Sequence, residues 1–551
     1  MDNRGLEAAA IAGVGYGRFG RMFPFAGRSL PDDCLQQIAD AMTFRIDIGK
    51  PINELELVDE NVAEVPAGYT YFGQFVDHDL SLDAASLKAS NVDVAALDDF
   101  RTPALDLDCV YGRGPDDQPY LYEDKGDDGL CVRLGKPLDA STAPVQTTQD
   151  ILRLKSGNSH PAILGDKRND ENRIVAQIQG LMIRFHNRVI GDKALISDFG
   201  GYPDDPRSRF RTAVDIVRWH YQWLVLNDFL PRVLDKNVLA KVRNAGGAPN
   251  LENYEKSAAR WAYIPVEFAG AAYRFGHSMV RPSYTLNMTA GANPKKPKKE
   301  QPDRIPIFSD KAGSHSNLNG FGVPVPHDWG IDWAFFFDGL DKTHLPDWFQ
   351  VPQPSYRIDA NLVSPLTILP EFRSKDDRPK KPSIFRNLAY RNLVRGCSNL
   401  RLPSGEQVAL ALGEPPLSSD IVWSAGSQVR RAVEGGLSGD DRKELTDVDE
   451  KRQAVLVAWP VLKGNTPLWY YILREAEWYG VDNLTEPGSA FGGRCLGPVG
   501  SRIVAETFVG VLANDPTSIL NRRPKLEPHP TISGGDPAGF CVGRLAKYAL
   551  S

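Results

Sequence analysis

The first residues that could do chemistry lie in 71-YFGQFVDHDLSLD-83, where a histidine stands between two acids. If this segment is helical, each residue turns by about 100°, so Gln74 and His78 share one face and Asp77 lies beside it. Asp79 is rotated by about 200° from Asp77 and points toward a second site. The alternative, which these letters alone favour, is the solvated polar end of a helix.

Oxygen-bearing residues alternate in the nearby segment 102-TPALDLD-108. Alternate residues of an extended loop face the same way, so their oxygens could wrap a hard cation, and Ca²⁺ prefers such ligands. Asp79 could complete the shell from the helix. The spacing is not that of an EF-hand, and composition alone favours a solvated acidic loop. The four candidate positions are Thr102, Ala104 (through its main-chain carbonyl), Asp106 and Asp108.

A permanent positive charge and a histidine in apolar surroundings lie farther along the chain. Arg168 and Glu171 stand at a predicted helix start, and arginine stays protonated, so Arg168 could polarise an O–O bond; a surface ion pair is the alternative. His277 lies in the aromatic segment 268-FAGAAYRFGHSMVRP-282. A neutral imidazole there suits an axial haem ligand, although a buried structural histidine is more common. The ring would need a second partner, for which the amide oxygen of Asn392 is a candidate.

Helices must position these residues, because strand-like alternation is sparse. The 41 prolines and 49 glycines indicate much irregular structure, concentrated in 283–330 and 345–383. The prediction is a mainly α-helical fold with long irregular loops. Since the candidate residues span more than half the chain, we expect one large domain over 60–545, with 1–59 as an N-terminal extension packed on it. Helical periodicity is seen in 170–190, 209–234, 256–280, 408–412 and 503–512.

Composition excludes several classes of function. The 551 residues carry a formal net charge of −6, so no basic excess is available for binding nucleic acid. No run of about 18 apolar residues predicts a membrane-spanning helix. Six scattered cysteines without a CxxC pair argue against a disulfide scaffold and a zinc ribbon. The N-terminus reads poorly as a secretory signal, which predicts a cytoplasmic protein or one exported by a leaderless route.

Six segments, in this order, resemble the animal-type haem peroxidases of the peroxidase–cyclooxygenase superfamily, and a bacterial-type member is expected. The stretch 497-GPVGSRIVAETFVGVL-512 also resembles the C-terminal part of that family. Any one motif is modestly specific, but six in order are strongly so. They read FGQFVDHDL, TPALDLDCVYG, GDKRNDEN, MIRFHNRV, YRFGHSMV and RNLVRGCSNLRLP.

The resemblance implies a role for each residue at the site. His78 would take a proton from hydrogen peroxide, Arg168 would stabilise the charge that develops as the O–O bond breaks, and Gln74 would orient waters or a halide. His277 would bind the iron of haem b, and Asn392 would accept a hydrogen bond from its ring.

Further implied roles concern the edges of the haem and the cation. Arg274 and Arg395 would pair with haem propionates, and Asp77 and Glu171 match the carboxylates that can form ester bonds to haem in this family. His186, in the His-Asn-Arg stretch, is expected to be structural. Calcium would be bound by Asp79, Thr102, Ala104, Asp106 and Asp108.

Some positions depart from the family pattern. Asn172 follows Glu171 where myeloperoxidase-like members have the methionine of a sulfonium link, which excludes that link. Ser81 replaces an acid found near a propionate in some members. Cyclooxygenase-like members have a radical-forming tyrosine three residues before the proximal histidine, where this chain has Arg274; Tyr273 is one residue off.

The resulting prediction is a peroxidase that reduces hydrogen peroxide and oxidises phenols, halides or thiocyanate, in keeping with a response to oxidative stress. The alternatives are a haem-dependent fatty-acid dioxygenase and a non-catalytic, calcium-stabilised haem-binding or sensor protein.

Overall fold

The computed structural model of this chain describes most of its residues. Part of the Lys-rich segment 294–304 lies outside these residues. The described residues are 17–44, 62–82, 94, 97–123, 127–139, 147–157, 159–244, 247–256, 262–290, 303–309, 315–345, 349, 351–370, 384–423, 450–479 and 492–551.

Helices dominate the described structure, as predicted, and long irregular connections join them in one large domain. The helices are α2 (Asp32–Ala41), α3 (Gly68–Leu80), α4 (Asp108–Tyr111), α5 (Arg173–Gly191), α6 (Lys193–Asp198), α7 (Pro206–Leu224), α8 (Leu230–Val233), α9 (Lys236–Arg243), α10 (Glu252–Lys256), α11 (Val266–Gly270), α12 (Leu388–Val394), α13 (Gly405–Ala411), α14 (Ser419–Trp423), α17 (Leu468–Tyr479), α18 (Pro498–Asn514), α19 (Ile519–Arg522), α20 (Pro530–Ser533) and α21 (Val542–Leu550).

The strands are short and form small separate sheets. β1 forms the centre of a three-stranded sheet in the order β4–β1–β7, and the remaining strands pair as β10–β3, β11–β2, β5–β6 and β8–β9. Their bounds are β1 (Gly17–Gly20), β2 (Thr43–Phe44), β3 (Val62–Pro66), β4 (Asp98–Asp99), β5 (Leu134–Asp139), β6 (Thr147–Ile151), β7 (Ile264–Pro265), β8 (Ser283–Tyr284), β9 (Ile305–Pro306), β10 (Pro354–Tyr356) and β11 (Leu362–Val363).

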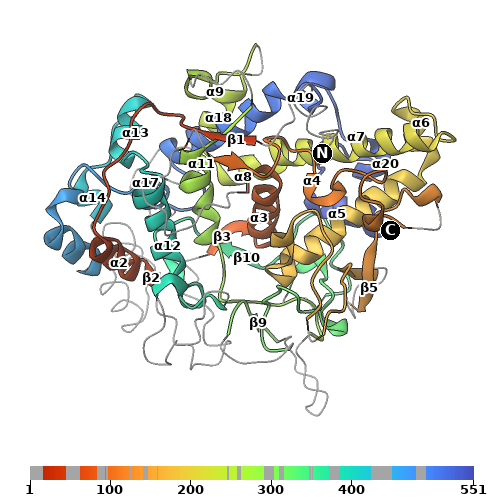
Figure 1. The fold of residues 1–551 in the computed structure, drawn as a ribbon, viewed down its shortest axis with the longest axis horizontal. Coiled ribbons are helices and arrows are strands. Elements are labelled where there is room, and N and C mark those ends of the chain that lie inside the picture. The colour runs from red at the N-terminus through yellow and green to blue at the C-terminus, as the bar shows by residue number, and fades with distance from the viewer. Residues whose placement is uncertain are drawn as a thin grey trace.

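Helix α3 runs through the middle of the molecule (Figure 1). It packs against α5 and against the 3₁₀ segment η7 (Ala272–His277), and α17 contacts η7 as well. Nearly every residue of α3 is buried. The central position leaves little room for side chains, and a Cβ on Gly73 would lie 2.9 Å from the ring of Phe229. The segments that carry both candidate histidines therefore face each other inside the core.

Helix α5 forms where the apolar periodicity predicts it. The side chain of Asn172 accepts a hydrogen bond from the main-chain N–H of Ile174 and so caps the helix. The predicted helix 209–234 also forms, but it extends past Pro231. A proline lacks an N–H group, and the π-helical turn Val225–Phe229 just before it joins α7 to α8 without a break in the chain direction.

The single helix expected over 256–280 does not form. Instead, the short strand β7 is followed by α11 and then by η7. Ala271, with φ −143° and ψ −70°, breaks the helix after Gly270. The apolar residues of this segment are buried on all sides, so tertiary packing decides its conformation and a helical period carries little information.

The described part of the N-terminal segment packs on the rest of the chain. Main-chain N–H groups of Met22 and Phe23 donate to the buried carboxylate of Glu267 in α11, at 3.0 Å and 3.4 Å. Helix α2 packs against α12. Helix α11, which Glu267 belongs to, comes just before the segment η7 that carries His277. A domain boundary near residue 60 stays a prediction.

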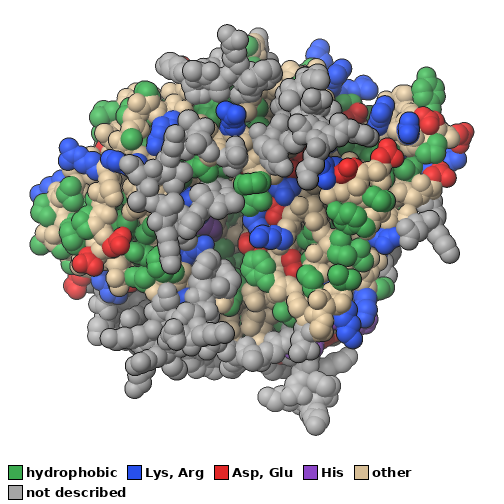
Figure 2. All heavy atoms as spheres, in the orientation of Figure 1, with side chains coloured by type: hydrophobic (Ala, Val, Ile, Leu, Met, Phe, Trp, Pro, Cys, Tyr) green, Lys and Arg blue, Asp and Glu red, His purple; other side chains and the backbone are tan. Residues whose placement is uncertain are grey.

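All six cysteines are free thiols in this structure. On the face drawn in Figure 2, the described acidic and basic side chains are interspersed among hydrophobic ones. Among the described helices, none is long and apolar enough to cross a membrane.

Replacement of Glu267 by glutamine should destabilise the fold by about 1–3 kcal/mol, because an amide cannot accept both main-chain hydrogen bonds and leaves a buried N–H without a partner. Urea unfolding followed by circular dichroism measures this change. Glu527→Gln, at an exposed position, is the matched control and should leave the midpoint in place. Equal midpoints for both variants would contradict the anchoring role of Glu267.

Candidate active site

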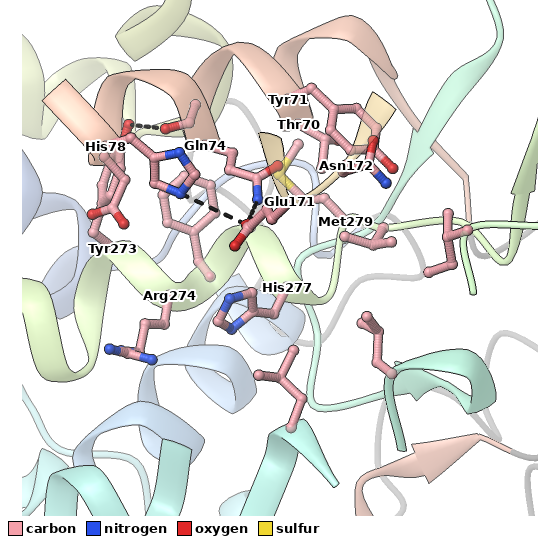
Figure 3. Close-up of a pocket in the computed structure, with 18 of the residues that line it drawn as sticks. Thr70, Tyr71, Gln74, His78, Glu171, Asn172, Tyr273, Arg274, His277 and Met279 are labelled. Carbon is pink, nitrogen blue, oxygen red and sulfur yellow. Dashed lines mark hydrogen bonds and ion pairs between the residues drawn. The ribbon is translucent and has the colours of Figure 1, made fainter. Parts of the chain in front are cut away.

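Two adjoining cavities lie between α3 and η7, with volumes of about 370 Å³ and 310 Å³. His78 and His277 both line the larger one, and Figure 3 shows their rings on opposite sides of it. The two cavities are contiguous because they share Asp77, His78, Glu171, Arg274, Leu388 and Arg391. The residues expected to contact a haem each line one cavity or both: Gln74, Asp77, His78, Arg168, Glu171, Arg274, His277, Asn392 and Arg395.

His78 is a neutral imidazole in this setting. Burial, followed by the positive charge of Arg168, lowers the pKa of His78 to about 3. Its Nδ1 lies 2.7 Å from the side-chain oxygen of Asn169. Its Nε2 lies 3.7 Å from a carboxylate oxygen of Glu171, at the cavity wall. A neutral ring with one nitrogen turned toward a cavity can take up a proton there.

Gln74 and His78 share one face of α3, as the helical spacing predicts, and Glu171 joins them (Figure 3). The amide nitrogen of Gln74 donates to the carboxylate of Glu171. Asp77 lies on the same wall, where burial raises its pKa against the lowering effect of Arg168 and Arg274. Amide, imidazole and carboxylate groups therefore line the wall of the cavity on the side of His78.

His277 contacts Asn392 as expected, but the direction of the hydrogen bond differs. Arg274 donates from Nη1 to the side-chain oxygen of Asn392 at 2.7 Å, so the amide nitrogen faces Nδ1 of His277 at 2.8 Å. The expected arrangement has the amide oxygen facing the ring. An amide can serve either polarity after a half turn. Burial, followed by the charges of Arg274 and Arg391, lowers the pKa of His277 to about 3, so this imidazole is neutral too.

Arginines gather around the smaller cavity. Arg168, Arg274, Arg391 and Arg395 all line it. The Nη2 of Arg168 donates to the main-chain oxygen of His78 at 2.9 Å and to the carboxylate of Asp166 at 2.7 Å, which fixes its guanidinium beside the histidine. Several guanidinium groups around one cavity suit a ligand that carries carboxylates.

Part of the wall of the larger cavity is apolar. It comes mostly from irregular segments, which the sequence assigned only as loops, so periodicity gave no signal for it. It includes Met279, Val280, Ile307, Phe308, Phe321, Leu366, Leu369 and Leu388.

The acids of the proposed cation site cluster on the other side of α3. Ligand atoms of Asp79, Asp106 and Asp108 lie within 4.8 Å of one another. Burial and the neighbouring acids raise the pKa of Asp79 well above its usual value and that of Asp106 to about 7. Such mutual repulsion between carboxylates is what a bound cation relieves. The hydroxyl of Thr102 donates to Asp106 at 2.7 Å.

The loop that carries these acids is not extended, contrary to the expectation. It bends between residues 101 and 106, and Leu107 is left-handed with φ 61°. Asp108 then begins α4, and its N–H donates to Asp106 at 3.2 Å. The N–H of Ala104 donates to the main-chain oxygen of Thr102 at 2.7 Å. The turn brings the acids together where alternation alone would have spaced them along a line.

Sequence reasoning missed several residues of the site. Arg391 lines both cavities, and its only signal was its place in 388-LAYRNLVRG-396. Asn169 and Asp166 contact His78 and Arg168; both lie in the segment GDKRNDEN, but sequence reasoning assigned neither a role there. His186 is structural as interpreted, since its ring contacts the hydroxyl of Tyr111 and the main-chain oxygen of Leu130.

Comparison with known families agrees with this site. Residues 95–311 match the animal haem peroxidase family, and this stretch contains Arg168, Arg274 and His277. Over this stretch, which is less than half of its length, the chain is therefore similar to the peroxidase–cyclooxygenase superfamily. Two neutral histidines across a cavity, with arginines around the adjoining one, fit a haem with its propionates.

Two curated proteins match shorter stretches. The human "Probable oxidoreductase PXDNL" is 27% identical over 197 residues, which make up 35% of this chain and 12% of that protein. "Heme peroxidase 2" of Caenorhabditis elegans is 28% identical over 142 residues, 25% of this chain and 19% of that protein. The matched stretches thus span less than a fifth of either relative.

Solved structures share the fold at low sequence identity. Peroxidase A from Dictyostelium discoideum has a TM-score of 0.54 at 14% identity, covering 98% of this chain and 94% of that chain. The fatty acid alpha-dioxygenase of Oryza sativa has a TM-score of 0.52 at 14% identity, covering 92% of this chain and 77% of that chain. Likeness at this level establishes the fold alone.

Replacement of Asn392 by leucine should weaken haem binding by roughly 10–100-fold, because the ring of His277 loses the partner that orients it. Haem titration followed by the Soret absorption measures the affinity. Asn399→Leu is the control, since Asn399 is a buried asparagine of the adjoining π-helical turn and lines neither cavity. Equal affinities of the two variants would show that Asn392 does not hold His277.

Proposed function

We propose that this protein is a haem peroxidase that reduces hydrogen peroxide and oxidises small donors such as phenols, halides or thiocyanate. The observation that carries the proposal is the pair of neutral histidines, His78 and His277, on opposite walls of one cavity. One ring is available to move a proton, and the other is available to bind a metal.

His277 would hold the iron of haem b through Nε2, because its Nδ1 faces Asn392. A neutral imidazole that binds metal through Nε2 carries its proton on Nδ1, so Asn392 would turn its oxygen toward the ring. Arg274, Arg391 and Arg395 would pair with the propionates. Bound haem would supply the electrons that break the O–O bond of peroxide.

On the distal side, His78 would take a proton from peroxide at Nε2 and return it to the departing oxygen. Arg168, fixed by Asp166, would stabilise the negative charge that develops on that oxygen. Gln74 would orient water at the same wall. Asp77 and Glu171 line both cavities, which supports them as the positions for ester links to the haem.

We also propose that Asp79, Asp106 and Asp108 bind Ca²⁺, with Thr102 and the main-chain carbonyl of Ala104 completing the shell. The cation would hold the loop against α3 and thereby steady the neighbouring His78. A role in the response to oxidative stress is a further part of this proposal.

A second candidate, fatty-acid dioxygenation, is favoured by one observation. The apolar wall of the larger cavity could accommodate an acyl chain, and Tyr273 lines the same cavity with its hydroxyl donating to the main-chain oxygen of Gly73 at 3.2 Å. Against it, the position three residues before His277 is Arg274. Oxygen uptake with an unsaturated fatty acid, and no turnover of a phenol with peroxide, would favour this alternative.

Haem-loaded protein should oxidise a phenolic donor with hydrogen peroxide, and His78→Ala should lower the rate by about 10²–10⁴-fold because the proton acceptor is lost. Stopped-flow absorption measures the reaction with peroxide. His315→Ala, at an exposed histidine, should behave as the unaltered protein. A His78→Ala protein that binds haem and keeps the full rate would refute the peroxidase proposal and would suit a sensor.

Added Ca²⁺ should raise the melting temperature, and a chelator should lower it, because the cation binds the folded acids and relieves their repulsion. Differential scanning fluorimetry measures the shift. Asp106→Asn should abolish the response, whereas Asp117→Asn, an exposed acid on the following loop, should preserve it. An equal Ca²⁺ response in both variants would place the cation elsewhere.

A further inference from the structure

A chain of side-chain amides leads from the ring of His78 to a main-chain carbonyl. Nδ1 of His78 lies 2.7 Å from the oxygen of Asn169. The nitrogen of Asn169 donates to the oxygen of Gln179 at 2.8 Å, and the nitrogen of Gln179 donates to the main-chain oxygen of Cys109 at 3.1 Å. Asn169 and Gln179 are fully buried, so water does not replace these partners.

The direction of this chain follows from its last member. A main-chain carbonyl only accepts, so Gln179 must present its nitrogen to Cys109 and its oxygen to Asn169. Asn169 must then present its nitrogen to Gln179 and its oxygen to His78. At 2.7 Å an amide oxygen and a ring nitrogen cannot both be acceptors, so the N–H must be on Nδ1 of His78. The proton of the neutral ring is therefore on Nδ1, and the lone pair is on Nε2.

We infer that Asn169 and Gln179 are positioning residues that fix the tautomer of His78, so that Nε2 faces the cavity as a proton acceptor. The opposite tautomer would place a donor on Nε2 and leave the oxygen of Asn169 without a partner in a buried site. This inference rests on the proposed peroxidase function for its purpose, but the tautomer itself follows from the geometry.

The anchor of the chain lies beside the proposed cation site. Cys109 follows Asp108 in α4, and its thiol contacts a carboxylate oxygen of Asp79 at 3.4 Å. Helix α5 supplies Gln179, and η5 (Lys167–Asp170) supplies Asn169. Three separate segments thus combine to orient one imidazole that belongs to a fourth, α3.

The protein offers a matched control on α5, the helix that carries Gln179. Gln177 is also buried in α5, and its amide donates to the main-chain oxygen of Trp329 at 3.0 Å and accepts from Ile331 at 2.8 Å. Replacement of Gln177 by leucine removes a buried amide without touching the contacts of His78. This variant therefore separates the loss of the hydrogen bonds between His78, Asn169 and Gln179 from a general destabilisation of α5.

The first measurement reads the tautomer itself, by ¹⁵N NMR of full-length protein labelled at histidine, in its ferrous carbonyl form. The resonances of His78 are identified by their loss in His78→Gln. We expect a protonated Nδ1 in the unaltered protein and in Gln177→Leu. Asn169→Leu and Gln179→Leu should populate the form protonated on Nε2. An unchanged tautomer in both relay variants would overturn the inference.

The second measurement is the C–O stretching frequency of the same carbonyl complex. An N–H on Nε2 would face the bound ligand and lower this frequency, whereas a lone pair would not. We expect a lower frequency in Asn169→Leu than in the unaltered protein. Asn169→Asp, which keeps an acceptor for Nδ1, should retain the unaltered frequency and tests the idea if the leucine variant fails to fold. A shift with Asp as large as that with Leu would contradict it.

The third measurement is the rate of reaction with peroxide, which should fall at least about tenfold in Asn169→Leu and remain unchanged in Gln177→Leu. The first two readouts do not require turnover. If the tautomer changes in Asn169→Leu but the unaltered protein has no peroxidase activity, the role of Asn169 and Gln179 is supported and the proposed function is refuted. If the unaltered protein is active but the tautomer does not change in the variants, the proposed function is supported and the role of Asn169 and Gln179 is refuted.

Discussion

The hydrogen bond from Nδ1 of His78 to the oxygen of Asn169 is the contact on which the distal side of this cavity depends. A histidine in the core could turn either nitrogen to the cavity, and the two choices have opposite chemistry. Burial keeps the ring neutral, but only a directed partner decides where its proton lies. The surrounding helices matter for function because they hold that partner in place.

Buried charge is organised around the same point. Asp166 pairs with Arg168 at 2.7 Å and with Arg101 at 3.1 Å, and Arg101 pairs with Asp108 of the acidic cluster at 3.1 Å. A buried arginine is tolerated only when its charge is matched and its N–H groups are bonded. The series of alternating charges gives each of these arginines an opposite charge, and it connects the loop beside α3 with the guanidinium next to His78.

The sequence predicted the helical fold and many of the residues that line the two cavities, because these depend on local period and on the identity of side chains. Gln74 and His78 share a face since four residues make about one turn of helix. The prediction of one helix around His277 was wrong. The apolar residues of that segment are packed on all sides, so their spacing reflects their tertiary contacts and not a helical period. Asn169 and Gln179 could not be recognised, since their role depends on which distant carbonyl lies next to them.

If peroxide is the substrate, the reactivity of the free cysteines toward peroxide becomes important. A thiol reacts with peroxide as the thiolate, and burial raises the pKa of Cys34 and Cys541 to about 11 and that of Cys397 to about 12. Fewer than about one in a thousand of these groups would be ionised at neutral pH. These three thiols would therefore react slowly with peroxide.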